Sequence, residues 1–392
     1  MVTRGVGILL LALALAWGGY RVYQEVLVPQ QEPRASLSPV DVLVGEATDG
    51  FERALEPRSF EFPADHGPHP SYRTEWWYVT GHLDDEEGRG FAFQVTFFRN
   101  ALTPTAGEGE SEWRTNQIYM AHFAVTDVEG ERHRAFERLA RAAVGLAGAE
   151  VRPFRVWVDG WRMEGRGEEE LFPFRVQAAE EDVEVDLEIF AGKPPVLQGD
   201  RGLSPKGEEP GNASYYYSYT RLPVQGRVRI GGEAVEVAGE AWMDREWSTS
   251  ALEPFHLGWD WFSLQLDDER ELMVFELRRD DGRPDPFDYG VVVERDGSYR
   301  TLSGSDVELS VTGTWASPVD GTVYPSRWRL QIPDEGFDLD VRPRVADQEM
   351  DLSFRYWEGA VEASGTGPDG PVTGRGFAEL TGYADTPGAR SP

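Results

Sequence analysis

The sequence predicts an all-β protein built from two related, barrel-like halves. Short runs with alternating apolar and polar residues recur along the chain, turn-forming residues separate them, and one block of sequence occurs twice. The run VEVDLEI at residues 183–189 is the clearest strand, because it presents one apolar and one polar face. Further strands are expected at residues 91–98, 118–127, 171–178, 224–230 and 234–242.

Two local features refine this pattern. Gly231-Gly232 separates two of the expected strands and is typical of a compact hairpin turn. Residues 136–146 are a weak candidate for a helix, since their apolar residues allow a helical spacing. Two loop-like insertions at residues 103–112 and 192–214 lengthen the first half. Loops as long as the second more often form a lid or the mouth of a site than a plain connection.

The repeated block indicates an internal duplication. Residues 76–86 (WWYVTGHLDDE) resemble residues 259–269 (WDWFSLQLDDE), and residues 239–244 (GEAWMD) resemble residues 374–379 (GRGFAE) in the same order. This alignment makes Asp244 and Glu379 equivalent. The unit that was duplicated spans roughly 130 residues, a size suited to a closed barrel without exposed sheet edges.

The N-terminal sequence predicts an export signal followed by a linker. Residues 1–4 are positively charged, and residues 5–20 form an uncharged, mostly apolar run that an extension to residue 28 would lengthen. We therefore expect residues 1–22 to be a signal peptide or a membrane anchor and residues 23–58 a linker. Residues 59–250 are expected to form the first barrel, which contains the ligand site, and residues 251–386 the second. The remainder is expected to be periplasmic or secreted.

Composition excludes several classes of function. The formal net charge of −31 argues against nucleic acid as a partner and leaves the N-terminal segment as the only expected membrane contact. The absence of cysteine excludes thiol catalysis, disulfides and Cys-ligated zinc. No serine-hydrolase elbow, zinc-protease, P-loop or dinucleotide motif occurs, and we expect neither a metal nor a cofactor. The two histidines of His66-Gly67-Pro68-His69 are expected to be exposed rather than metal ligands.

Several motifs together resemble one family of exported proteins. They are EWWY at residues 75–78, MAHF at 120–123, PVLQG at 195–199, WMDREW at 242–247 and YWEG at 356–359. The combination is similar to the AttH-like family, which is related to the carotenoid 1,2-hydratases, and it extends over residues 60–383. This resemblance implies two tandem lipocalin-like β-barrels, often labelled as secreted hydrolases and often encoded beside ABC-type exporters.

The same resemblance implies a chemistry. Carotenoid hydratases add water to an isolated C=C bond without a cofactor, by protonation to a tertiary carbocation, and their acid is an aspartate. The motif places that aspartate on Asp244 and a neighbouring aromatic residue on Trp242. The hydratases also use a histidine in a strand upstream, whereas residues 214–219 of this chain contain none. This departure sets the chain apart from the carotenoid reaction itself.

The residues around Asp244 support an acid site on their own. Protonation of an alkene needs a carboxyl kept neutral by apolar surroundings and aromatic faces that stabilise a cation. The aromatic residues expected to line such a ligand site are Trp77, Tyr215, Tyr217, Tyr219, Trp242, Trp247, Trp259 and Trp261. The alternative is that Asp244 forms an ion pair with Arg245 or Arg221 and the Trp residues fill a core.

Two further catalytic candidates lie on other expected strands. Glu75 would share a face with Trp77, which makes it a second candidate acid, although a Trp at this place commonly plugs the closed end of a barrel beneath an Arg. His122 is a candidate base if it faces the lumen, and otherwise a hydrogen-bonded structural residue. Two functions remain open: a hydratase, lyase or isomerase acting on a hydrophobic small molecule, or a non-catalytic carrier for an envelope transporter.

Overall fold

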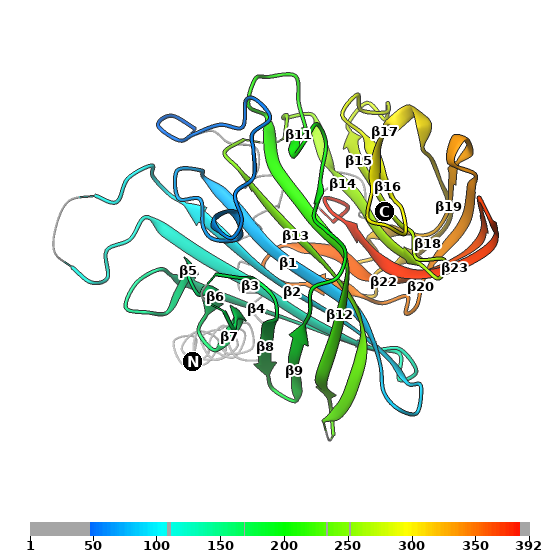
Figure 1. The fold of residues 1–392 in the computed structure, drawn as a ribbon, viewed down its shortest axis with the longest axis horizontal. Helices are drawn as coiled ribbons and strands as arrows, with labels where there is room; N and C mark the ends of the chain where they lie inside the picture. The colour runs from blue at the N-terminus through cyan, green and yellow to red at the C-terminus, as the bar shows by residue number, and fades with distance from the viewer. Residues whose placement is uncertain (1–47, 108–110, 168, 233, 251, 385–392) are drawn as a thin grey trace, which may run out of the picture. The chain divides into compact units, whose positions relative to one another are not determined.

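The computed structural model describes residues 48–384, except 108–110, 168, 233 and 251, and these form two antiparallel sheets without an α-helix (Figure 1). The expected signal or anchor and most of the linker lie outside the described residues. The first sheet contains β1 (Thr74–Asp84), β2 (Gly90–Ala101), β3 (Gln117–Asp127), β4 (Arg132–Arg141), β5 (Ala147–Val151), β6 (Phe154–Val158), β7 (Trp161–Gly165), β8 (Phe174–Glu180), β9 (Val183–Ile189), β10 (Val196–Leu197), β11 (Leu203–Pro205), β12 (Ala213–Ile230) and β13 (Val235–Ser248). The second contains β14 (His256–Leu266), β15 (Glu271–Arg279), β16 (Tyr289–Val293), β17 (Tyr299–Ser303), β18 (Glu308–Ala316), β19 (Val323–Ile332), β20 (Phe337–Pro343), β21 (Glu349–Asp351), β22 (Arg355–Gly367) and β23 (Gly370–Leu380).

The two sheets repeat one topology. The strand order β4-β3-β2-β1-β13-β12 in the first sheet corresponds to β17-β16-β15-β14-β23-β22 in the second. Even the register agrees, because Tyr78 pairs with Asp244 in the first sheet as Trp261 pairs with Glu379 in the second. The predicted all-β class and the internal duplication are therefore confirmed. The first sheet is barrel-like, and the second is a half-barrel.

The candidate helix at residues 136–146 is wrong, since this segment begins within β4. Strand β4 pairs along its length with β3, and Phe136 stacks on Phe123 with ring centroids 6.0 Å apart. Arg138 on the same strand lies over the Trp161 ring of β7, at 4.6 Å, and forms an ion pair with Glu180 on β8. Tertiary pairing overrides local helix propensity here. The hairpin expected at Gly231-Gly232 is confirmed, with positive φ at both glycines.

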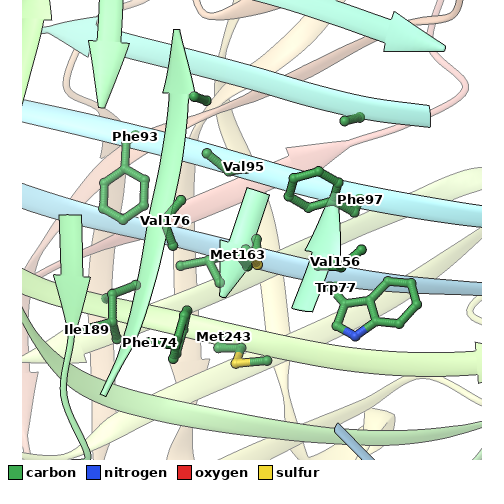
Figure 2. Close-up of a cluster of buried hydrophobic side chains, with 14 of the residues drawn as sticks. Trp77, Phe93, Val95, Phe97, Val156, Met163, Phe174, Val176, Ile189 and Met243 are labelled. Atoms are coloured by element: carbon green, nitrogen blue, oxygen red, sulfur yellow. The ribbon is translucent and has the colours of Figure 1, made fainter. Parts of the chain in front are cut away.

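Side chains fill the interior of the first half. Figure 2 shows aromatic and aliphatic side chains from β1, β2 and β13 meeting those from β6, β7, β8 and β9. Trp77 is fully buried there, and the Arg245 guanidinium lies 3.9 Å from the centre of its ring, as expected for a closed barrel end. Each large apolar side chain buried in this way contributes about 1.5–3 kcal/mol. The space that the sequence suggests for a ligand is thus occupied by a packed core.

The opposite face of the same strands is buried as well. Outward-facing side chains of β1, β2, β12 and β13 pack with side chains of β14, β15, β16, β22 and β23 in a separate cluster. Its aromatic members are Tyr78, Tyr216, Trp242, Trp261, Phe275, Tyr289 and Phe377. The central strands of the first sheet therefore have an inner face in the first core and an outer face against the second sheet.

Candidate functional site

A cavity of about 120 Å³ lies between the outer face of the first sheet and the second sheet. Its lining is mostly apolar and aromatic, with a few carboxyl groups. The lining residues are Thr74, Trp76, Tyr78, Thr96, Phe98, Asn100, Met120, Lys206, Tyr216, Asp244, Glu246, Leu252, Trp259, Trp261, Phe275, Phe354, Tyr356, Glu358 and Glu379. Both halves contribute, so neither half alone forms this pocket.

Strand alternation determines which residues reach the pocket. On β13, Asp244 and Glu246 line the pocket, whereas Arg245 between them points to the first core. On β12, Tyr216 lines the pocket, and Tyr217 belongs to the first core. The structure thus differs from the sequence expectation in location: the candidate acid faces the other half instead of the interior of its own.

Asp244 is buried and accepts hydrogen bonds from three side chains. Trp242 Nε1 donates to Oδ1 over 2.7 Å, the Tyr216 hydroxyl donates to Oδ2 over 2.8 Å, and the Ser218 hydroxyl donates to Oδ1. Burial raises the pKa of Asp244 to about 7, although these three donors act in the opposite direction. The carboxyl can therefore both hold and release a proton near neutral pH.

The ion-pair alternative for Asp244 is not what the structure shows. Arg245 pairs with Glu75 on the inner face, and Arg221 pairs with Glu240 and Glu271. Asp244 makes no ion pair with either arginine. Because no described residue forms an ion pair with Asp244, hydrogen bonds are what offsets the desolvation of its carboxylate.

The second half adds two carboxyls to the pocket. Burial raises the pKa of Glu358 on β22 to about 8, while the nearby hydroxyls of Tyr78 and Tyr356 act in the opposite direction. Burial, together with the Glu358, Asp244 and Glu246 carboxyls, also raises the pKa of Glu379 well above its ordinary value. Although Tyr78 is close enough to affect Glu358, neither its hydroxyl nor Glu358 Oε1 makes a hydrogen bond of normal geometry.

The long insertion of the first half reaches the pocket. Lys206, which follows β11, forms an ion pair with Glu246 over 2.8 Å. Its ammonium also lies 4.5 Å from the centre of the Phe275 ring on β15. A loop that was expected to form a mouth or lid thus contributes Lys206, the one cation among the described residues that line the pocket.

The predicted ligand-binding residues divide between the two faces. Trp242 contacts Asp244, and Trp259 and Trp261 line the pocket. The remaining five, however, lie in the first core, away from the pocket, and are Trp77, Tyr215, Tyr217, Tyr219 and Trp247. Strand alternation is the reason, because residues one position apart point to opposite faces. Tyr216 takes the place beside Asp244 that the sequence assigned to its neighbours.

Glu75 shares the inner face with Trp77 as expected, but its surroundings do not suit an acid. Its carboxylate is fully buried and paired with Arg99 and Arg245, and it accepts a hydrogen bond from the backbone of His69. Burial alone would raise its pKa, but the two guanidinium groups outweigh burial and hold the pKa well below the ordinary value. Glu75 is a permanently ionised carboxylate at the barrel end.

His122 lies on the outer face of β3 and contacts the second half. Its Nδ1 is 2.8 Å from the Tyr356 hydroxyl, and its Nε2 is 3.2 Å from Glu137 Oε2 on β4. It does not line the pocket itself, whereas Tyr356 does. His122 is therefore separated from the pocket by one hydroxyl group.

The two histidines expected in an exposed loop are instead packed inside. His66 Nδ1 is 2.7 Å from the Tyr217 hydroxyl, and His69 lies between Asp65 and Glu75 and stacks on Trp247 at 3.7 Å. No cluster of metal-ligating side chains occurs within the described ranges. The same residues contain no helix long and apolar enough to cross a membrane.

Comparison with known proteins decides the family. A family model described as AttH-like matches residues 53–383. The chain belongs to the AttH-like family. A crystal structure of an AttH protein from Nitrosomonas europaea is 34% identical to this AttH-like protein, with a TM-score of 0.75 and coverage of 85% of this chain and 100% of that one.

Two enzymes also resemble this AttH-like protein, one in its fold and one in part of its sequence. Kievitone hydratase from Nectria haematococca has the same fold, with a TM-score of 0.64 at 16% identity over 85% of this chain and 98% of its own. The dehydratase asqC of Emericella nidulans is 22% identical over 195 residues, which are 47% of this chain and 53% of that protein. The AttH-like chain thus spans about half the length of the curated relative that it matches.

The sequence identified only part of the contribution of the second half to the site, namely Trp259 and Trp261. Glu358, Glu379 and Tyr356 of the second half and Tyr78 of the first also line the pocket, and none of these four was a predicted site residue. A signal for them was present, because the duplication makes Glu379 the equivalent of Asp244. Applying the repeat to β12 and β22 likewise makes Ser218 the equivalent of Glu358, since each pairs with the matching carboxyl.

Proposed function

We propose that this AttH-like protein is a cofactor-independent hydratase or dehydratase for a hydrophobic, isoprenoid-like small molecule, with Asp244 as the general acid. The observation on which this rests is a carboxyl with a pKa of about 7 in a mostly apolar, aromatic pocket. General acids are most effective when their pKa lies near the working pH. The hydratase and dehydratase among the relatives support the same class of reaction.

In the hydration direction, Asp244 donates its proton to the less substituted carbon of the C=C bond, and the more substituted carbon becomes a cation. The faces of Trp76, Trp259 and Phe354, which line the pocket, stabilise this cation. Water then adds to the cation and loses one proton to a second carboxyl. Dehydration is the reverse: the hydroxyl is protonated and leaves as water, and Asp244 removes the neighbouring C–H proton.

The test is turnover of a panel of prenylated phenols and isoprenoid alkenes, including kievitone, in water labelled with oxygen-18. Mass spectrometry is expected to find the label in a tertiary alcohol product. The D244N variant keeps the shape of the side chain but cannot supply the proton, so we expect turnover to fall by about 100-fold or more.

The matched control is D186N, which removes a carboxylate of the first half that pairs with Arg175 away from the pocket. Its turnover should equal that of the wild type. Equal turnover by D244N and wild type, with both proteins folded by circular dichroism, would overturn the assignment of Asp244.

A non-catalytic carrier or accessory factor of an envelope transporter is the second candidate. It is favoured by the apolar, partly enclosed pocket and by an N-terminal segment that reads as an export signal or anchor for a periplasmic or secreted protein. Mass spectrometry of small molecules extracted from the purified protein distinguishes the two. A carrier returns its ligand chemically unchanged after long incubation, whereas the hydratase yields an alkene and its alcohol.

A further inference from the structure

We propose that Tyr356, His122 and Glu137 form a proton-transfer path that connects Glu358 in the pocket to solvent beside β4. The inference rests on the proposed function and adds positioning and transfer residues to it. It assigns His122 a role through Tyr356, not direct contact with the ligand. The path crosses from the second half to the first, because Tyr356 lies on β22 and the other two residues on β3 and β4.

Hydrogen-bond contacts link Tyr356 to Glu137 through His122, and Glu358 lies two positions from Tyr356 on the same face of β22. Tyr356 lines the pocket beside Glu358, and its hydroxyl is 2.8 Å from His122 Nδ1. On the other side of the imidazole ring, Nε2 is 3.2 Å from Glu137 Oε2. The His122 side chain is fully buried, whereas the Glu137 side chain is 20% exposed. The path therefore begins in a partly enclosed pocket and ends at a carboxylate that water can reach.

The protonation states give this chain a direction. Burial lowers the pKa of His122, so the ring is neutral and has one N–H. Burial acts to raise the pKa of Glu137, but hydrogen bonds from His122 and Ser353 outweigh it and leave the pKa lowered, so Glu137 is ionised. An ionised Glu137 accepts the Nε2–H, which leaves Nδ1 to accept the Tyr356 hydroxyl proton. All donors in the path thus point away from the pocket.

Such a path carries away the proton that the attacking water loses during hydration. The proton lost by the attacking water goes to Glu358 Oε1, which has no hydrogen-bond partner among the described residues. The proton that Glu358 already holds moves to the Tyr356 oxygen, the Tyr356 proton moves to His122 Nδ1, and the Nε2 proton moves to Glu137. Glu358 and Tyr356 end unchanged, Glu137 gains one proton for release to solvent, and Asp244 regains one from solvent. His122 ends with its proton on Nδ1, and a rotation of the imidazole side chain brings an N–H back toward Glu137 before the next turnover.

The groups around the path favour transfer over permanent charge. Phe98 and Phe354 pack against His122, with ring centroids 5.2 and 4.9 Å away. Burial together with Glu358 and Glu379 raises the pKa of Tyr356 well above its ordinary value, which prevents it from remaining a phenolate. Tyr78 and Asp244 face Glu358 and Glu379 from the first half. Within the described ranges, no Lys or Arg forms an ion pair with Glu137, and its contact to His122 is a hydrogen bond to a neutral ring.

The kinetic test compares E137Q, E137D and Y356F on the alkene that the wild type converts. Glutamine can still accept the Nε2–H bond but cannot take the proton, so we expect E137Q to lower kcat about 10-fold or more with KM unchanged. The E137D variant should keep most of the wild-type rate. Added imidazole buffer should restore most of the rate that E137Q loses. Y356F interrupts the path inside the pocket and should not respond to buffer.

Glu181 provides the control. It is exposed and pairs with Arg134, which lies on β4 as Glu137 does. E181Q should match the wild type. A KM change without a kcat change in E137Q, or a full rate in Y356F, would contradict the path while leaving the proposed hydration intact.

A measurement without substrate separates the two proposals. Nitrogen-15 NMR of histidine-labelled protein, with H122N to assign the signal, should find a neutral His122 with the proton on Nε2 from pH 7 to 9. If the wild type converts no alkene, the proposed function fails, and this spectrum alone decides the path. A charged imidazole at pH 7, or a proton on Nδ1, would overturn the path.

Discussion

Glu75 and Asp244 are both buried carboxyls on the paired strands β1 and β13, yet their environments are opposite. Glu75 faces the first core and is paired with Arg99 and Arg245, which keep it ionised. Asp244 faces the second half, has three neutral donors and no cation, and its pKa rises to about 7. One face of the sheet thus uses a carboxylate to close a barrel, and the other holds an acid that can exchange its proton.

The largest expected difference between the two residues is in stability. E75Q leaves two buried guanidinium groups without their carboxylate, so we expect the free energy of unfolding to fall by about 3–5 kcal/mol. D244N removes no ion pair, and at pH 7 it should be at least as stable as the wild type. Urea unfolding followed by tryptophan fluorescence measures both, and equal losses in the two variants would remove the contrast.

The pH dependence of stability gives a second, somewhat smaller difference. Between about pH 4 and 7 the folded protein retains the Asp244 proton, which the unfolded chain has lost from a group of pKa 3.8. The folded state therefore binds more protons in this window, and the wild type loses stability as the pH rises. D244N lacks this loss, so its stability relative to the wild type should increase by up to about 4 kcal/mol between pH 4 and 8.

The inner and outer faces of the first sheet also explain how much of this site the sequence can predict. The blocks at residues 76–86 and 259–269 predicted the duplication, and the motif placed Asp244 and Trp242 together. Alternation predicted that Trp76 and Trp77 face opposite ways, but both faces are covered, so the pattern could not tell which one faces the pocket. Asp244 shares the pocket with Glu358 and Glu379, which lie more than one hundred positions away, because of how the two sheets pack, and no local period encodes that.

Adjacent tyrosines on β12 offer a matched pair of variants with a smaller effect. Tyr217 donates or accepts a hydrogen bond with His66 in the first core, so Y217F should cost about 1 kcal/mol of stability and leave turnover unchanged. Tyr216 donates to Asp244, so Y216F should alter turnover and its pH profile. A comparison of kcat and unfolding free energy for the two variants tests the assignment of faces, and activity loss in Y217F alone would reverse it.

The smallest expected effect is a shift of the pH profile in W242F. Removing the Trp242 Nε1–H takes away one donor that stabilises the Asp244 carboxylate. The pKa of Asp244 should therefore rise further, and the alkaline limb of the hydration rate should move to higher pH while the fold is kept. An unchanged profile would mean that this hydrogen bond has no influence on the acid.

The pKa of Asp244 itself tests the central claim most directly. Carbon-13 NMR of protein labelled at the aspartate and glutamate carboxyls, with D244N and E75Q to assign the two signals, follows both groups between pH 4 and 9. A midpoint near 7, in contrast to a Glu75 that stays ionised throughout, is the predicted result. An Asp244 that is already fully ionised at pH 5 would contradict the account of the pocket as an acid site.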